Sequence, residues 1–158
     1  MAIDFYDLLE YGGKNANYYY CVETGERFYE NDELFVSFKG DYTFIKIPNV
    51  YSDDYKIECI KKFIKLPQNP DLLYLLEIKD CFEFLCAFGE WQHDIIWVEQ
   101  SVELEESCTR FFSLMKRYTL AKWCNENNIE WTDNYFEDEE ERAQLIKKLK
   151  EEENNDND

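Results

Sequence analysis

Pro48 separates two parts of the sequence that have different hydrophobic periods. Before it, aromatic and β-branched residues form short runs between turn residues, as in segments 18–22 and 42–47. After it, apolar residues recur every three or four positions, as they do in segment 57–64. Side chains alternate along a strand and recur about every 3.6 residues along a helix. The sequence therefore predicts an α+β fold, in which N-terminal antiparallel strands over about residues 17–47 pack against a mainly helical C-terminal part.

Two hairpins are expected before Pro48. The first joins runs 18–22 and 27–29, and the second joins runs 34–38 and 42–47, each around a turn that contains glycine. Short β-favouring runs separated by such turns are typical of hairpins. A short helix over residues 3–10, ended by Gly12 and Gly13, is expected ahead of them.

The helices expected after Pro48 are marked by capping and breaking residues. Ser52 and Asp80 are suited to cap helix N-termini, while Pro67 and Gly89 are expected to end helices. The apolar segment 94–98 is expected to be either a strand or the start of a helix. The expected helical segments are 53–66, 70–76, 81–88, 101–126 and 137–152.

The domain prediction follows from the absence of internal repeats and of linkers rich in Pro, Gly or Ser. One α+β domain is expected over residues 1–135, followed by an acidic helical extension over 136–158 with a disordered end from about residue 153. Segment 137–158 contains ten acids and four bases, which gives −6. Since the whole chain carries −18, the remainder carries −12, and the acidity belongs mainly to the folded part.

The negative charge limits the kinds of molecule that this protein is expected to bind. An acidic surface repels the phosphates of nucleic acids and anionic membranes, so neither direct phosphate contact nor membrane binding is expected. No apolar stretch approaches the roughly 20 residues of a membrane span. The first ten residues carry acids and no base, unlike a signal peptide. A cytoplasmic location and six reduced cysteines are therefore expected.

The residues that could carry chemistry form no recognisable motif. The closest cysteines are Cys81 and Cys86, and no second close pair completes a zinc-binding set. Glycine-rich phosphate-binding loops are absent. His93 is the sole histidine, so a nucleophilic site would require it to meet a thiol or hydroxyl in space. The sequence predicts no catalytic residue, no metal site and no cofactor.

Several short motifs occur in a characteristic order: Glu23-Thr24-Gly25, Ile47-Pro48 before helix 55–63, Cys81-Phe82 to Leu85, and Ala121-Lys122-Trp123-Cys124 with Ile129. This order resembles that of the bacterial uncharacterised protein family 0158. The resemblance covers about residues 1–131. That family has no established activity, so the resemblance implies a bacterial, cytosolic α+β protein and carries no catalytic residue across.

The leading hypothesis for function is a non-enzymatic protein that binds another protein, because aromatic residues are abundant and catalytic motifs are absent. One alternative is an immunity or inhibitor protein whose acidic face covers a basic toxin or nuclease surface. An alternative of another class is an enzyme with a dispersed site of His93 and neighbouring carboxylates. The candidate partner-binding residues are Tyr18, Tyr20, Phe28, Trp91, His93 and Trp97.

Overall fold

The computed structural model describes residues 2–10, 17–134 and 139–156. The chain forms two compact units, of which unit 1 comprises Met1–Ser52 and Lys116–Asp158, and unit 2 comprises Asp53–Met115. The long helix α5 (Val102–Glu126) contributes its first part to unit 2 and its second part to unit 1. The domain boundary predicted at residue 135 falls outside the described residues and stays a prediction.

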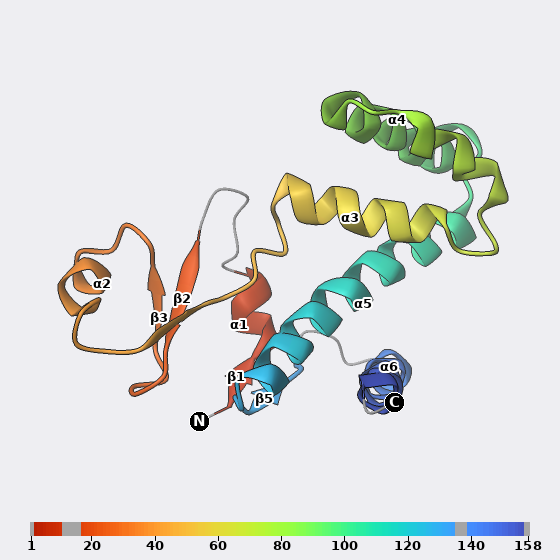
Figure 1. Ribbon diagram of the computed structural model, residues 1–158. Helices are drawn as coiled ribbons and strands as arrows, with labels where there is room; N and C mark the ends of the chain where they lie inside the picture. The colour runs from red at the N-terminus through yellow and green to blue at the C-terminus, as the bar shows by residue number, and fades with distance from the viewer. Residues whose placement is uncertain (1, 11–16, 135–138, 157–158) are drawn as a thin grey trace. The chain divides into compact units, whose positions relative to one another are not determined.

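Unit 1 contains a three-stranded antiparallel sheet, which confirms the predicted α+β class and the first hairpin (Figure 1). Strand β2 (Tyr18–Cys21) lies between β3 (Arg27–Tyr29) and β4 (Phe44–Lys46). The turn after β2 places Gly25 at a φ of +73°, a conformation that glycine adopts without steric cost. The Glu23 carboxylate accepts hydrogen bonds from the Thr43 backbone N–H at 2.9 and 3.0 Å, which guides the chain into β4.

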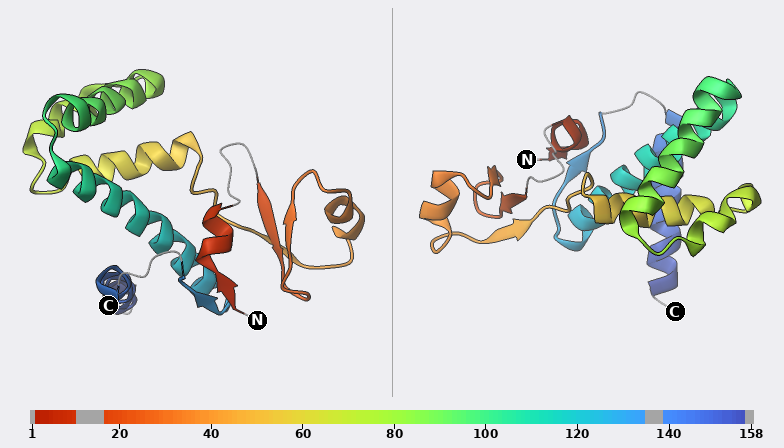
Figure 2. Two further views of the ribbon diagram at one scale, coloured as in Figure 1. Left: turned by 180° about the vertical axis from the view of Figure 1, so that it is seen from behind. Right: turned by 90° about the horizontal axis from the view of Figure 1, so that it is seen from above.

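The second predicted hairpin is wrong, because its first run is the helix α2 (Glu33–Phe38). The Asp32 carboxylate caps this helix by accepting from the Leu34 N–H at 2.8 Å, and Glu33 occupies the first turn. With residues 34–38 in a helix beside β3 (Figure 2), β4 pairs with β2 instead. The local cap therefore outweighs the β propensity of the run.

The aromatic residues of the sheet pack on both of its faces. On one face the Tyr19 ring stacks on Phe35 of α2 at 4.7 Å between centroids, and Phe35 also meets Phe44 edge-on at 5.0 Å. On the other face the Tyr20 ring meets Trp123 of α5 edge-on at 6.2 Å. The run of tyrosines in β2 thus supplies packing in two directions, as alternation along a strand requires.

The predicted helix over residues 3–10 is correct only from Phe5 onward. Helix α1 is Phe5–Glu10, and the two residues before it form β1 (Ile3–Asp4). β1 pairs in parallel with β5 (Trp131–Thr132), a long-range partner that a local pattern does not reveal. The predicted stop at Gly12 and Gly13 lies outside the described residues.

Unit 2 is helical throughout. It contains α3 (Asp53–Ile64), the 3-10 helix η1 (Pro70–Glu77), α4 (Cys81–His93), the π-helical turn η2 (Asp94–Val98) and the first part of α5. Asp80 caps α4 as predicted, accepting from the Glu83 N–H at 2.9 Å. The predicted stop at Gly89 is wrong, because this exposed glycine lacks the positive φ of a helix end and α4 continues past it.

The core of unit 2 is an aromatic cluster centred on Phe63, which is 1% exposed. Rings from α4 and α5 surround it at centroid distances of 5.3 to 6.1 Å. Such ring contacts fix the relative positions of the three helices within the unit. The surrounding residues are Phe88, Trp91, Phe111 and Phe112.

Helix α6 (Glu139–Asp156) is attached to the rest of unit 1 by a buried ionic cluster. The fully buried Arg117 of α5 donates to the Asp133 carboxylate at 2.5 Å and to the Glu141 carboxylate at 2.9 Å. Leu145 is buried beside them, and Lys122 pairs with Glu152 at 3.4 Å. Helix α6 extends to Asp156, past the position from which a disordered end is predicted, and residues 157–158 lie outside the described residues.

Candidate functional site: the Trp97 corner

The turn that joins α4 to α5, which we call the Trp97 corner (residues 93–102), has an unusual backbone. The chain widens into the π-helical turn η2, in which the Glu99 N–H donates to the Asp94 carbonyl at 2.8 Å. The turn ends at Gln100, whose φ of +51° lies in the left-handed region. π-helical turns are rare and frequently occur at functional sites, and a left-handed residue other than glycine costs about 1 kcal/mol.

The corner presents apolar side chains to solvent while one residue anchors it. Ile95 is buried, whereas Trp97 and Val98 are each 70% exposed and Val102 is 64% exposed. Ser101 fixes the start of α5, because its hydroxyl accepts from the Leu104 N–H at 3.3 Å. Several exposed apolar side chains on one fixed turn are characteristic of an interaction surface.

All charged residues in the sequence around the corner are acidic. From Glu90 to Thr109 the chain carries six acids and no lysine or arginine, and all six acids are exposed. Because charges of one sign over a short span add up, this segment contributes a negative potential at the corner. The six acids are Glu90, Asp94, Glu99, Glu103, Glu105 and Glu106.

Three of the six predicted partner-binding residues belong to this region of unit 2. His93 is exposed, and its ring lies 6.4 Å from that of Trp97, while its Nδ1 lies 3.8 Å from the Asp94 carboxylate. Trp91 is half-buried instead, and its ring packs on Phe88 at 5.4 Å in the core of the unit. The structure therefore brings His93 and Trp97 together at the surface and uses Trp91 for packing.

The other three predicted residues belong to the sheet of unit 1. Tyr18, Tyr20 and Phe28 are half-buried, and each contacts a further aromatic ring. The Tyr18 ring lies 5.5 Å from Tyr29, and the Phe28 ring lies 5.7 Å from Phe44. These ring contacts, like that of Tyr20 with Trp123, join residues of unit 1 to one another. The three aromatic side chains therefore serve packing within the fold.

The described residues offer little support for nucleophilic or metal chemistry near His93. Among residues 2–10, 17–134 and 139–156, no group of three or more His, Cys, Asp or Glu side chains could hold a metal ion. Burial raises the pKa of the Cys108 thiol to about 11, although a hydrogen bond from Gln92 acts to lower it. A thiol with such a pKa is protonated at neutral pH and is therefore not an activated nucleophile.

Sequence reasoning missed Val98 and Val102, although a signal for Val102 exists. The apolar stripe of α5 begins at Cys108, and Val102 precedes it by six positions. Since each residue turns the helix by about 100°, Val102 lies roughly 120° away from that stripe. An apolar residue off the stripe and among acids indicates a second apolar surface.

Comparisons of this chain with protein-family models, with curated proteins and with solved structures found no match. The resemblance to family 0158 therefore stays a prediction. In the part of the chain that the structure describes, no helix is both long enough and apolar enough to cross a membrane.

Proposed function

We propose that this protein acts by binding another protein, and that the Trp97 corner is the contact surface. The observation that carries the proposal is the exposure of Trp97, Val98 and Val102 on a turn that Ile95 anchors. Tryptophan is the residue type most enriched among those that dominate binding free energy, because it buries a large area at a small cost in side-chain entropy.

The corner is ordered before any partner arrives, which favours binding. The Glu99 N–H bonds the Asp94 carbonyl and the Ser101 N–H bonds the Ile95 carbonyl, both at 2.8 Å. These bonds fix the backbone that carries Trp97 and Val98. A preordered surface loses less conformational entropy on association, so more of the contact energy is available as affinity.

The charge around the corner favours a basic partner. Six exposed acids without a lysine or arginine attract a positively charged protein surface and repel an acidic one. The partner that fits has an apolar pocket for Trp97 with basic residues around it. A basic toxin or nuclease surface has this chemistry, and covering it would make the protein an inhibitor.

Affinity capture with matched variants tests the proposal. The full chain, Trp97→Ala and the control Tyr74→Ala serve as baits, because Tyr74 is also an exposed aromatic residue of unit 2, at 61%. We expect a basic protein that is retained by the wild type and by the control and is lost with Trp97→Ala. Calorimetry on the purified pair should show binding weakened about 30-fold by Trp97→Ala, the effect of a dominant contact residue.

Salt dependence gives an independent measurement on the same pair. Raising the ionic strength from about 0.05 to 0.5 M should slow association, because screening removes the electrostatic attraction. Equal retention of the partner by the wild type and Trp97→Ala, or capture of an acidic protein that is insensitive to salt, would contradict the proposal.

A further inference from the structure

A second surface feature lies in unit 1, at the C-terminal end of α5, and is unrelated to the Trp97 corner. A shallow, open hollow lies there between the helix end and β5. The lining residues that matter for its chemistry are Asn125, Asn128, Ile129, Glu130, Trp131 and Thr132.

The hollow is formed by the way in which α5 ends. The Ile129 N–H donates to the Cys124 carbonyl at 2.8 Å and the Asn128 N–H donates to the Asn125 carbonyl at 3.3 Å, which is a Schellman motif. Asn128 occupies the left-handed position of the motif with a φ of +56°. Glycine adopts this conformation at lower cost, but asparagine adds a side-chain amide to the lining of the hollow.

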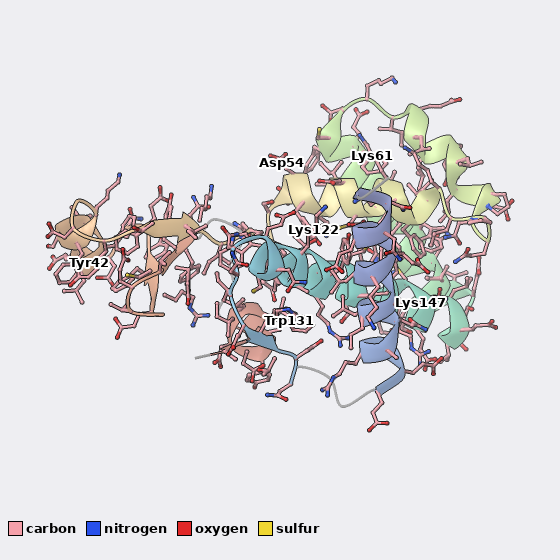
Figure 3. All side chains as sticks on the ribbon, turned by 60° about the horizontal axis from the view of Figure 1, so that its bottom comes forward. Tyr42, Asp54, Lys61, Lys122, Trp131 and Lys147 are labelled. Atoms are coloured by element: carbon pink, nitrogen blue, oxygen red, sulfur yellow. The ribbon has the colours of Figure 1, made fainter. Side chains whose placement is uncertain are left out.

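Trp131 is held in place by three sets of contacts. Its ring stacks nearly parallel on Phe5 of α1, with centroids 4.9 Å apart and an angle of 7°. Figure 3 labels Trp131 beside this helix. Its indole N–H donates to the Asn125 side-chain oxygen at 3.0 Å, and its backbone pairs with Ile3 in β1. Its orientation is therefore fixed within unit 1 before any ligand binds.

The electrostatics of the hollow favour a cation. Of the described residues that line it, Glu130 carries the one charge and none is lysine or arginine. The negative end of the α5 helix dipole lies at the same place. The nearby cation of α5, Lys122, is paired with Glu152 at 3.4 Å.

We infer that this hollow binds a basic amino-acid side chain, with the guanidinium of arginine as the best fit. A guanidinium is flat, so it stacks on an indole ring, and its N–H groups can bond a carboxylate and an amide oxygen at the same time. Trp131, Glu130 and Asn128 all line the hollow, and they are the residues that would supply those three groups. The ligand is either free arginine or an arginine within a peptide, since both carry the same side chain.

NMR of the tryptophan indole N–H groups in the full chain tests this inference. Trp131→Phe assigns the Trp131 signal among the four tryptophans. Titration with argininamide should move that signal saturably below about 10 mM, a range that corresponds to weak single-site binding. Citrulline amide has nearly the same shape and the same α-amino group but no charge on its side chain, and it should leave the signal in place. Free arginine and N-acetyl-arginine methylamide then distinguish the two sources.

Three variants separate a specific site from general attraction by an acidic protein. Glu130→Gln and Asn128→Gly should each weaken argininamide binding about tenfold, because each removes a partner of the charged ligand. Neither change should unfold the protein, since the β1 contact uses the Glu130 backbone carbonyl and glycine suits the Asn128 conformation. Glu126→Gln, at the end of the same helix, is the control and should change affinity by less than about twofold.

Three results would overturn the inference. They are an unmoved Trp131 signal, an equal response to citrulline amide, and an equal loss of affinity in the Glu126→Gln control. Trp97→Ala should have no effect on argininamide binding, because Trp97 is not among the residues that line the hollow. Failure of this inference is therefore distinguishable from failure of the proposed protein-binding function.

Discussion

At the scale of single residues, Arg117 and Asp133 are the most consequential pair in unit 1. Their side chains are 0% and 1% exposed, and Arg117 connects α5 both to the segment after β5 and to α6. Asp133→Asn keeps the shape of the side chain but removes the charge opposite a buried guanidinium. We expect a loss of about 3 kcal/mol in the free energy of unfolding, because the buried guanidinium keeps the Glu141 carboxylate but loses that of Asp133, and removing one partner of a buried ion pair is strongly destabilising. Urea denaturation measures this loss.

The control is Glu58→Gln, which breaks the exposed Lys62–Glu58 pair and should cost less than about 1 kcal/mol in the free energy of unfolding. Similar losses in both variants would contradict a special role for the buried pair.

At the scale of secondary-structure elements, the cap of α2 decides between a helix and a strand. Asp32→Ala removes the hydrogen bond to the Leu34 N–H and should cost about 1 kcal/mol in the free energy of unfolding. Asp41→Ala, an exposed acid in the loop after α2, is the control and should be nearly neutral. Equal stability of Asp32→Ala and the wild type would show that the cap does not hold the helix.

Helix α2 also illustrates why some parts of the fold can be predicted from the sequence and others cannot. Segments 53–64 and 102–126 are long and periodic, so their helical pattern identifies them without tertiary information. Segment 34–38 is too short for a period to decide, and one cap outweighs its β propensity. β1 and β5 have only two residues each, and their pairing joins positions far apart in the sequence.

The candidate site was predicted only in part, for a similar reason. Trp97 and His93 stand out by residue type, but which aromatic residues are exposed depends on packing. Trp91 and Trp97 are six positions apart, and one enters the Phe63 cluster while the other is 70% exposed. The π-helical turn that separates their environments has no distinctive sequence signature.

At the scale of the whole molecule, the net charge of −18 affects stability as well as binding. Thirty-five acids against 17 bases place many like charges close together in the folded state, and unfolding moves them apart. Because salt screens this repulsion, the melting temperature should rise by several degrees as NaCl increases from about 0.02 to 0.5 M. Calorimetry at neutral pH measures the change, and guanidinium chloride is avoided because it is itself a salt. The buried Arg117 cluster is shielded from solvent, so Asp133→Asn should show the same salt dependence from a lower starting temperature. A melting temperature that falls as salt is added would mean that ion pairs, and not repulsion, dominate the electrostatics of the folded chain.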